Sequence, residues 1–88
     1  MGGSWQVYIL LCADGSYYTG SSSDAARRLA QHNSGMGAKY TRGRGPCGIV
    51  YLEQCADKGA ALSREAAIKK LSHSEKAAMA AKYMKGEI

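Results

Sequence analysis

Four polar residues in the first part of the chain carry groups that could bind a phosphate and move a proton. Tyr8 and Tyr18 have phenol hydroxyls, while Arg28 and His32 stand four residues apart and would share one face of a helix. A guanidinium binds a phosphate through paired, charge-assisted hydrogen bonds, and an imidazole is a common proton carrier. Taken alone, the two tyrosines are more typical of packing under a helix, and a single Arg or His is common on a solvated helix surface. Their placement in the fold therefore decides between the two interpretations.

A predicted helix over residues 60–71 adds a carboxylate to this set. Ala61, Glu65 and Ile68 fall on one stripe of that helix. A carboxylate on an apolar stripe is costly to bury unless it is paired or bound to a metal ion. The alternative is a surface ion pair between Glu65 and Lys69, one helical turn later. The position of Glu65 on the stripe favours the functional role.

A β-hairpin is expected to position the two tyrosines, because two apolar runs flank Asp14-Gly15. A two-residue loop would place Tyr8 and Tyr18 on opposite faces of the hairpin. A three-residue turn with Gly15 left-handed in a bulge pairs Tyr8 with Gly20 and Leu10 with Tyr18, so both phenols share a face. We favour the three-residue turn, because it leaves an apolar row on the other face, formed by Trp5, Val7, Ile9 and Leu11.

The remaining pattern predicts an α+β fold, a three-stranded and mostly antiparallel sheet flanked by helices. Ser21 to Asp24 offer N-caps for a helix that begins near Ala25, and residues 47–54 predict a third strand covered on both faces. A capping-box pattern at Ser72-His73-Ser74-Glu75 begins a last helix that runs to about Lys85. We expect one domain over residues 1–88, with its core at about 5–76 and a C-terminal helix at about 73–85.

Composition favours a folded protein, its basic balance suits a polyanionic partner, and its cysteines lead us to expect a cytoplasmic location. It has 88 residues, a formal net charge of +5 and no apolar run that could span a membrane. The first residues, Met1-Gly2-Gly3-Ser4, lack the basic and apolar regions that are typical of a signal peptide. Cys12, Cys47 and Cys55 are an odd set without close pairs, which indicates reduced thiols, with Cys12 and Cys47 as small buried residues.

A glycine-bracketed basic segment follows the first predicted helix. Lys39, Tyr40, Arg42 and Arg44 could clamp phosphates, with Tyr40 stacking on a base. The alternative is a solvated basic loop. We place these four residues, together with Arg27, among the candidates for nucleic-acid binding.

Five short motifs, taken in order, resemble the GIY-YIG nuclease domain. They are Gln6-Val7-Tyr8, Tyr18-Thr19-Gly20, Arg28-x-x-x-His32, the run from Gly35 to Arg42, and Leu62-Ser63-Arg64-Glu65. The small, stand-alone bacterial branch of that family is the most similar, and the match extends from Trp5 to about Lys76. Gln6 replaces a glycine of the first motif and Thr19 replaces an isoleucine of the second, but neither change removes a functional group.

The resemblance implies endonucleolytic hydrolysis of a DNA phosphodiester with one divalent metal ion, Mg²⁺ or Mn²⁺. By position, Glu65 would bind the metal and Arg28 would stabilise charge on the scissile phosphate. Tyr8 and Tyr18 would line the nucleophilic water, one of them acting as general base or orienting a hydroxide. His32 would support Arg28 or a phosphate and assist proton transfer. Which tyrosine is the base stays open.

Two other functions are compatible with the sequence. The domain could bind nucleic acid without cutting it, or act as an accessory subunit whose protein partner supplies specificity. Retention of Glu65 argues against a pure binder, because a carboxylate near phosphates weakens binding unless a metal ion lies between them. We therefore expect a nuclease with DNA favoured over RNA as its substrate.

Overall fold

The computed structural model describes residues 4–36 and 43–86 as an α+β fold, as the sequence predicts. Three strands form one sheet, and three helices pack on its two faces. In chain order the elements are β1 (Trp5–Leu11), β2 (Tyr17–Ser22), α1 (Ala25–Asn33), β3 (Gly48–Cys55), α2 (Lys58–Lys69) and α3 (His73–Met84).

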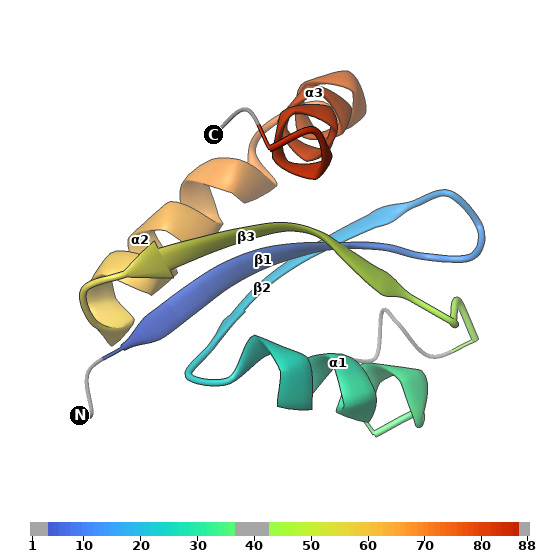
Figure 1. Cartoon of the computed structure of the whole chain (residues 1–88), viewed down its shortest axis with the longest axis horizontal. Coiled ribbons are helices and arrows are strands. Elements are labelled where there is room, and N and C mark those ends of the chain that lie inside the picture. The colour runs from blue at the N-terminus through green and yellow to red at the C-terminus, as the bar shows by residue number, and fades with distance from the viewer. Residues whose placement is uncertain (1–3, 37–42, 87–88) are drawn as a thin grey trace.

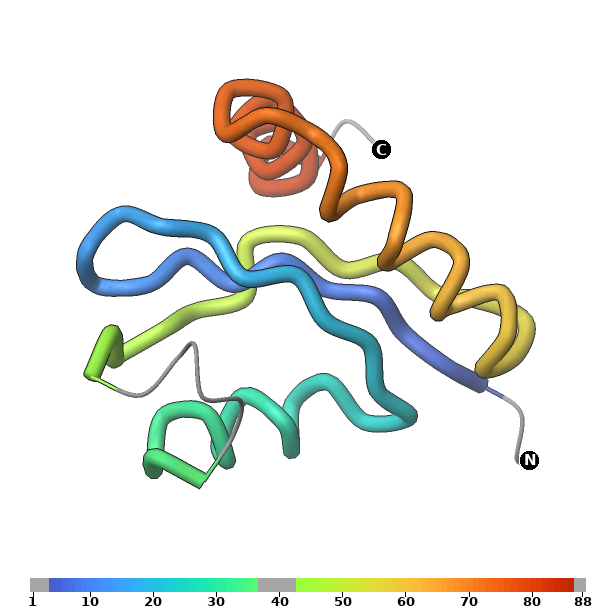
Figure 2. The backbone as a smooth tube through the Cα atoms, turned by 180° about the vertical axis from the view of Figure 1, so that it is seen from behind, coloured from blue at the N-terminus to red at the C-terminus, as the bar shows by residue number. Residues whose placement is uncertain are grey.

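The sheet has the order β2-β1-β3, and both neighbouring pairs are antiparallel. Helix α1 lies on one face of the sheet, while α2 and α3 lie on the other (Figure 1). Figure 2 shows the same layers from behind. The central strand β1 is covered on both sides, so Val7, Tyr8, Ile9 and Leu10 are each at most 1% exposed. This strand joins the two halves of the core.

Alternating side chains of β1 feed two separate apolar clusters. Val7 and Ile9 pack with Tyr51, Ala61 and Ile68 on the side of α2 and α3. On the other side, under α1, the buried residues are Tyr8, Leu10, Cys12, Ala25 and Cys47. The alternation has the period of two that a strand imposes, so one strand stabilises both layers.

The hairpin has the three-residue turn that we favoured from sequence. Tyr8 pairs with Gly20 and Leu10 with Tyr18. The turn closes through hydrogen bonds from Cys12 N to Ser16 O (2.8 Å) and from Gly15 N to Cys12 O (2.9 Å). Gly15 has φ +86°, a conformation that side chains disfavour. Because of this register, both tyrosines pack on the α1 face of the sheet.

Strand β3 lies at the sheet edge and contains a bulge opposite Ile9 and Leu10. Ile9 pairs with Tyr51 but Leu10 pairs with Ile49, which leaves Val50 as the extra residue. The predicted packing on both faces is present. Tyr51 is nevertheless the one buried residue of this strand, which has β1 as its single neighbour among residues 4–36 and 43–86.

Side-chain caps define where the helices begin. Asp24 accepts a hydrogen bond from Arg27 N, and Asp57 accepts one from Ala60 N. Ser72 begins α3 with the capping box that the sequence predicts. Helix α2 begins two residues earlier than predicted, at Lys58, because Asp57 caps it. In residues 4–36 and 43–86, no helix is both long and apolar enough to cross a membrane.

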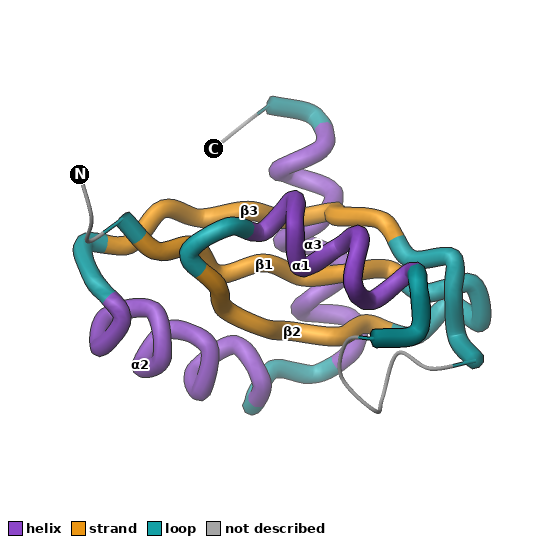
Figure 3. Tube along the Cα trace, turned by 90° about the horizontal axis from the view of Figure 1, so that it is seen from below, coloured by secondary structure: helices purple, strands orange, loops and turns teal. Residues whose placement is uncertain are grey.

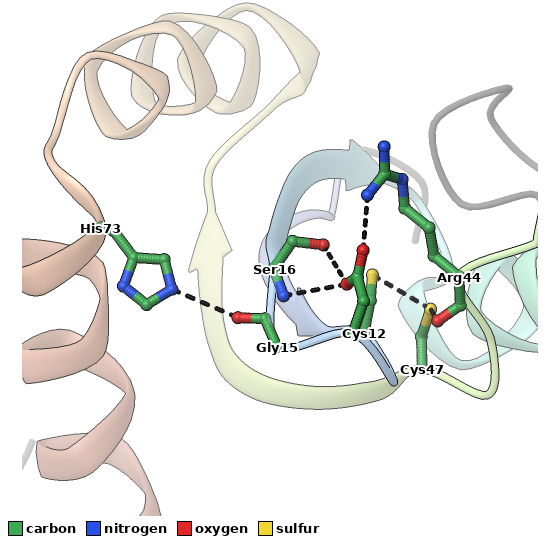
Figure 4. A network of polar contacts seen from close by, with 7 residues as sticks. Cys12, Gly15, Ser16, Arg44, Cys47 and His73 are labelled. Atoms are coloured by element: carbon green, nitrogen blue, oxygen red, sulfur yellow. Dashed lines mark hydrogen bonds and ion pairs between the residues drawn. The ribbon is translucent and has the colours of Figure 1, made fainter.

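The hairpin tip is tied to three later parts of the chain (Figure 4). Gly15 O lies 3.2 Å from His73 Nε2, and Cys12 Sγ lies 3.3 Å from Cys47 Sγ. Asp14 accepts hydrogen bonds from Ser16 and pairs with Arg44, and these contacts lower the pKa of the Asp14 carboxyl to about 2. Cys12 and Cys47 are buried free thiols, as predicted.

Candidate active site

The Tyr8 hydroxyl and the His32 imidazole meet beneath α1. Tyr8 is 1% exposed, and its Oη lies 3.2 Å from His32 Nε2. The Tyr18 ring packs against the same imidazole, with 5.1 Å between ring centroids. Residues from β1, β2 and α1 therefore enclose one imidazole, in agreement with the shared face predicted for the two tyrosines.

Gly20 makes room for this arrangement. A Cβ at position 20 would lie 2.6 Å from Tyr8 Oη, 2.8 Å from Tyr8 Cζ and 3.1 Å from Tyr18 Cε2. Contacts this short are not tolerated, so a side chain here would displace one or both rings. The bare backbone of Gly20 lets the two phenols lie next to each other on one face of the hairpin.

Arg28 completes the cluster on the α1 side. Its guanidinium reaches the Tyr8 hydroxyl, and its Nη1 donates a hydrogen bond of 2.6 Å to Gln31 Oε1. Burial raises the pKa of Tyr8 more than Arg28 lowers it, so the phenol is protonated at neutral pH. Burial, assisted by the Arg28 charge, lowers the pKa of His32 and favours the neutral imidazole.

Glu65 approaches the tyrosines from the opposite layer. It lies on α2, which runs alongside the β2 edge (Figure 3). Its Oε1 accepts a hydrogen bond of 2.6 Å from Ser21 Oγ, and its Oε2 lies 2.7 Å from Lys69 Nζ. The carboxylate is close enough to raise the pKa of Tyr8 slightly. The ion pair with Lys69 that we considered as the alternative is therefore present.

Three contacts fix α1 on the sheet. Gln6 Oε1 accepts a hydrogen bond of 2.8 Å from Ala25 N at the start of the helix. At its end, Asn33 Oδ1 accepts from Cys47 N (2.6 Å) and Asn33 Nδ2 donates to Cys47 O (3.0 Å). These contacts at the two ends hold the helix that carries Arg28 and His32.

The predicted nucleic-acid-binding residues are only partly described. Lys39, Tyr40 and Arg42 lie outside the described residues. Arg44 is exposed in part and pairs with Asp14 at the hairpin tip, at a distance of 2.5 Å. Arg27 is exposed in the first turn of α1, one position before Arg28. Of the five candidates, Arg27 and Arg44 are thus placed by the structure.

The described part of the chain contains no cluster of three or more His, Cys, Asp and Glu side chains that could hold a metal ion. Glu65 alone is a suitable donor set for Mg²⁺, which prefers oxygen ligands and keeps several waters, often with one or two carboxylates and substrate phosphates. A cation already lies against this carboxylate, the Lys69 ammonium. The chemistry of the site therefore fits one hard divalent ion and does not fit a closed zinc centre.

The family model of the GIY-YIG catalytic domain matches residues 4–78, which include every residue of this cluster. The chain belongs to the GIY-YIG family. Membership places it in a superfamily of endonucleases that act on nucleic acid and generally use a divalent metal ion.

The relatives of this GIY-YIG domain are small proteins. A UPF0213 protein of Halobacterium salinarum is 49% identical over 73 residues, which cover 83% of this chain and 95% of its own. A UPF0213 protein of Clostridium perfringens is 53% identical, with coverage of 80% and 75%. The solution NMR structure of a UPF0213 protein from Bacillus halodurans is 45% identical with a TM-score of 0.56, and the match covers 89% of this chain and 83% of that one.

Sequence reasoning missed three residues that support the GIY-YIG site. Gln31 contacts Arg28, and its spacing of three along the helix was an available signal. Gln6 was noted only as a departure from the first motif, although its side chain anchors α1. The contact of Ser21 with Glu65 gave no signal, because it depends on how α2 packs on β2.

Proposed function

We propose that this GIY-YIG domain is a metal-dependent endonuclease that hydrolyses phosphodiester bonds in DNA, with structural selectivity or low sequence specificity. One observation carries the proposal. Two phenols, a guanidinium and an imidazole from three elements meet on the α1 side, and a carboxylate reaches the same edge from α2. A packing role for the tyrosines does not require an arginine and a histidine beside the Tyr8 hydroxyl.

Arg28 is the proposed phosphate-binding group. Its positive charge lies beside Tyr8 and His32, where it would stabilise negative charge that develops on the scissile phosphate. Gln31 holds one guanidinium nitrogen and thereby limits the directions in which the other nitrogens can point. Arg28→Ala is expected to stop cleavage by removing this charge.

Tyr8 and His32 supply a route for a proton. The neutral imidazole has one unprotonated nitrogen, and with that nitrogen at Nε2 it can accept the hydrogen bond of the Tyr8 hydroxyl at 3.2 Å. Because burial raises the pKa of Tyr8, a free phenolate is not expected, and Tyr8 would take a proton from an attacking water as its own proton passes to His32. Tyr18, which packs on the same imidazole, would line the position of that water. This order makes Tyr8 the proposed base.

Glu65 is the proposed metal ligand, and Ser21 Oγ orients its carboxylate. When bound there, Mg²⁺ or Mn²⁺ would supply a Lewis acid and activate a water at neutral pH. Arg27, Lys39, Arg42 and Arg44 are the proposed contacts to the nucleic-acid backbone, and Tyr40 would stack on a base. Such contacts would bind many sequences in the same way.

The decisive variant is Glu65→Gln. It should abolish cleavage across a panel of plasmid, flap, junction and RNA substrates with Mg²⁺ or Mn²⁺. DNA affinity should stay equal or rise slightly, because a negative charge near phosphates has been removed. The amide retains the size of the carboxyl, so the protein should remain folded.

A matched control is Glu53→Gln. Glu53 is also a partly buried, ion-paired carboxylate, but its partners are Arg64 and the Tyr51 hydroxyl, and it pairs with Val7 on the face of the sheet opposite Tyr8 and Tyr18. This variant should cut like the wild type. A Glu65→Gln protein that cuts at the wild-type rate would disprove the proposed role. A wild-type protein that binds DNA but cuts none of the substrates with either metal would indicate a binding module or an accessory subunit instead.

A further inference from the structure

Both oxygens of the Glu65 carboxylate already have a partner. Ser21 Oγ donates to Oε1 at 2.6 Å, and Lys69 Nζ lies 2.7 Å from Oε2. Each oxygen keeps a second lone pair, so the Ser21 hydroxyl can stay when a metal ion binds, but a divalent cation and the Lys69 ammonium on one carboxylate would repel each other. The arrangement therefore couples metal binding to the movement of a named side chain.

Exposure indicates which partner gives way. The Glu65 side chain is 17% exposed, whereas that of Lys69 is 51% exposed. Lys69 is the last residue of α2, and its ammonium can turn into water at little cost. Ser21 lies in a strand, and its hydroxyl can orient a metal-bound carboxylate as well as a free one. Lys69 is thus the partner that a cation replaces.

The displaced ammonium would stay beside the site. Lys69 is one helical turn from Glu65 and close enough to the Tyr18 phenol to interact with it electrostatically. A phosphate held between the metal and Arg28 would lie within the same region. An ammonium on a flexible stem is a common phosphate ligand.

We propose that Lys69 is an exchangeable cation of this active site, a residue that no sequence motif singled out for function. It pairs with Glu65 in the metal-free protein, and when a divalent ion takes that place it binds a phosphate of the nucleic acid. The inference rests on the proposed function, because it needs Glu65 to be the metal ligand.

Metal binding without nucleic acid tests the first half. Mn²⁺ is titrated into wild type, Lys69→Met and Lys70→Met, and binding is followed by calorimetry and by paramagnetic broadening of amide signals near Glu65. Loss of the competing ammonium should tighten Mn²⁺ binding to Lys69→Met by about two- to five-fold. Lys70→Met removes the same charge at the exposed C-cap of α2, so it should bind Mn²⁺ like the wild type.

DNA binding tests the second half. A labelled duplex is titrated over a range of salt concentrations, with and without Ca²⁺, which uses similar oxygen ligands. With Ca²⁺, Lys69→Met should bind DNA more weakly and reduce the slope of log affinity against log salt by about one. Without a metal ion, Lys69 remains paired with Glu65, so the same substitution should change little. Lys70→Met should show no such dependence on Ca²⁺.

Glu65→Gln distinguishes a failure of the proposed metal site from a failure of the role proposed for Lys69. If it binds Mn²⁺ like the wild type, Glu65 is not the ligand and the proposed function loses its metal site. If it loses Mn²⁺ binding while Lys69→Met binds Mn²⁺ unchanged, the metal site stands and the role of Lys69 is wrong. An equal loss of DNA affinity in Lys69→Met with and without Ca²⁺ would overturn the exchange.

Discussion

At the scale of single residues, the site depends on the smallest side chain in it. Gly20 is surrounded by the Tyr8 hydroxyl and the Tyr18 ring, at distances that leave no space for a methyl group. A glycine is therefore needed after Tyr18-Thr19 in the second motif, because a larger residue would collide with the two tyrosine side chains. Gly20 does not have a positive φ, whereas Gly15 at the turn does, so the reason for a glycine at position 20 is space and not backbone conformation.

We expect Gly20→Ala to displace Tyr8 and to lower the free energy of unfolding by about 1–3 kcal/mol, the usual cost of overpacking. The measurement is denaturant unfolding, together with the shift of the Tyr8 ring signals in NMR spectra. Gly48→Ala is the matched control, because a Cβ at position 48 meets no atom within 4 Å. Equal stability of the two variants would show that the pocket around Tyr8 relaxes freely.

His32 should make the fold sensitive to mild acid. Its pKa is lowered from 6.5 in the folded state, so below that pH the unfolded chain binds more protons than the folded one. The stabilising effect is complete above the unfolded pKa and is lost as the pH falls below it. The free energy of unfolding should therefore drop between about pH 7 and pH 5.5, before most carboxylates titrate.

His32→Gln is the variant that isolates this effect, because it removes the titrating ring but keeps a polar group near Tyr8. Its unfolding free energy should be lower at pH 7.5 and flatter over the same interval. His73→Gln, at the exposed start of α3, should keep the wild-type decline. If the slope persists in His32→Gln, another group causes it.

Much of the site could be predicted from the sequence, because the turn geometry and the helical repeat determine where four of its residues lie. The turn at Asp14-Gly15 fixes the hairpin register, and the register places Tyr8 beside Tyr18. The positions of Arg28 and His32 follow from helical spacing. Glu65 was harder, because the ion pair with Lys69 and the approach to the tyrosines are both present, whereas we had treated them as alternatives.

At the scale of elements, the caps of α1 and α2 hold the two halves of the site. Asp24 caps the helix that carries Arg28 and His32, and Asp57 caps the helix that carries Glu65. Both caps accept a hydrogen bond from a backbone N–H in the first turn. The two acids thus offer a matched pair of substitutions that loosen one half at a time.

Asp24→Ala should cost about 1 kcal/mol of stability and speed hydrogen exchange in the first turn of α1 but not of α2. Asp57→Ala should show the reverse pattern at similar cost. Exchange measured residue by residue distinguishes them. Fraying of both helices in either variant would mean that the two layers open together and do not respond separately.

The elements themselves were predictable, but their assembly was less so. Capping residues and the glycine turn act within a few residues, so helix starts and the hairpin follow from sequence. The order β2-β1-β3 and the bulge at Val50 depend on contacts between distant segments. The apolar run of β3 correctly predicted packing on both faces, but its place at the edge of the sheet could not be read from that run.

At the scale of the whole molecule, a formal net charge of +5 should govern nucleic-acid binding. The double variant Arg42→Ala, Arg44→Ala should lower DNA affinity evenly across sequences and reduce the salt slope by up to about two. Arg44 also pairs with Asp14, so its loss would leave this carboxylate without its cationic partner beside the proposed DNA contacts. Binding is measured on several unrelated duplexes at a series of salt concentrations.

A second pair of cations provides the control for this prediction. Lys82 and Lys85 are exposed at the end of α3, and their replacement by Ala removes the same formal charge. This variant should keep most of the wild-type affinity and slope. If both double variants lose DNA affinity and salt dependence to the same extent, net charge alone determines binding and the basic segment is not a specific contact.

The central position of β1 in the sheet also affects the order in which its two edges can pair during synthesis. Strand β1 is made before the other two strands of the sheet and lies between them, yet Trp5 pairs with Cys55 and Leu11 with Gly48. The local hairpin with β2 can close within microseconds, whereas the other edge of β1 waits until β3 has been synthesised. At ribosomal rates of about 5–20 residues per second, that wait lasts on the order of seconds. During it, the nascent chain displays an unpaired strand edge flanked by the apolar side chains that later form both cores.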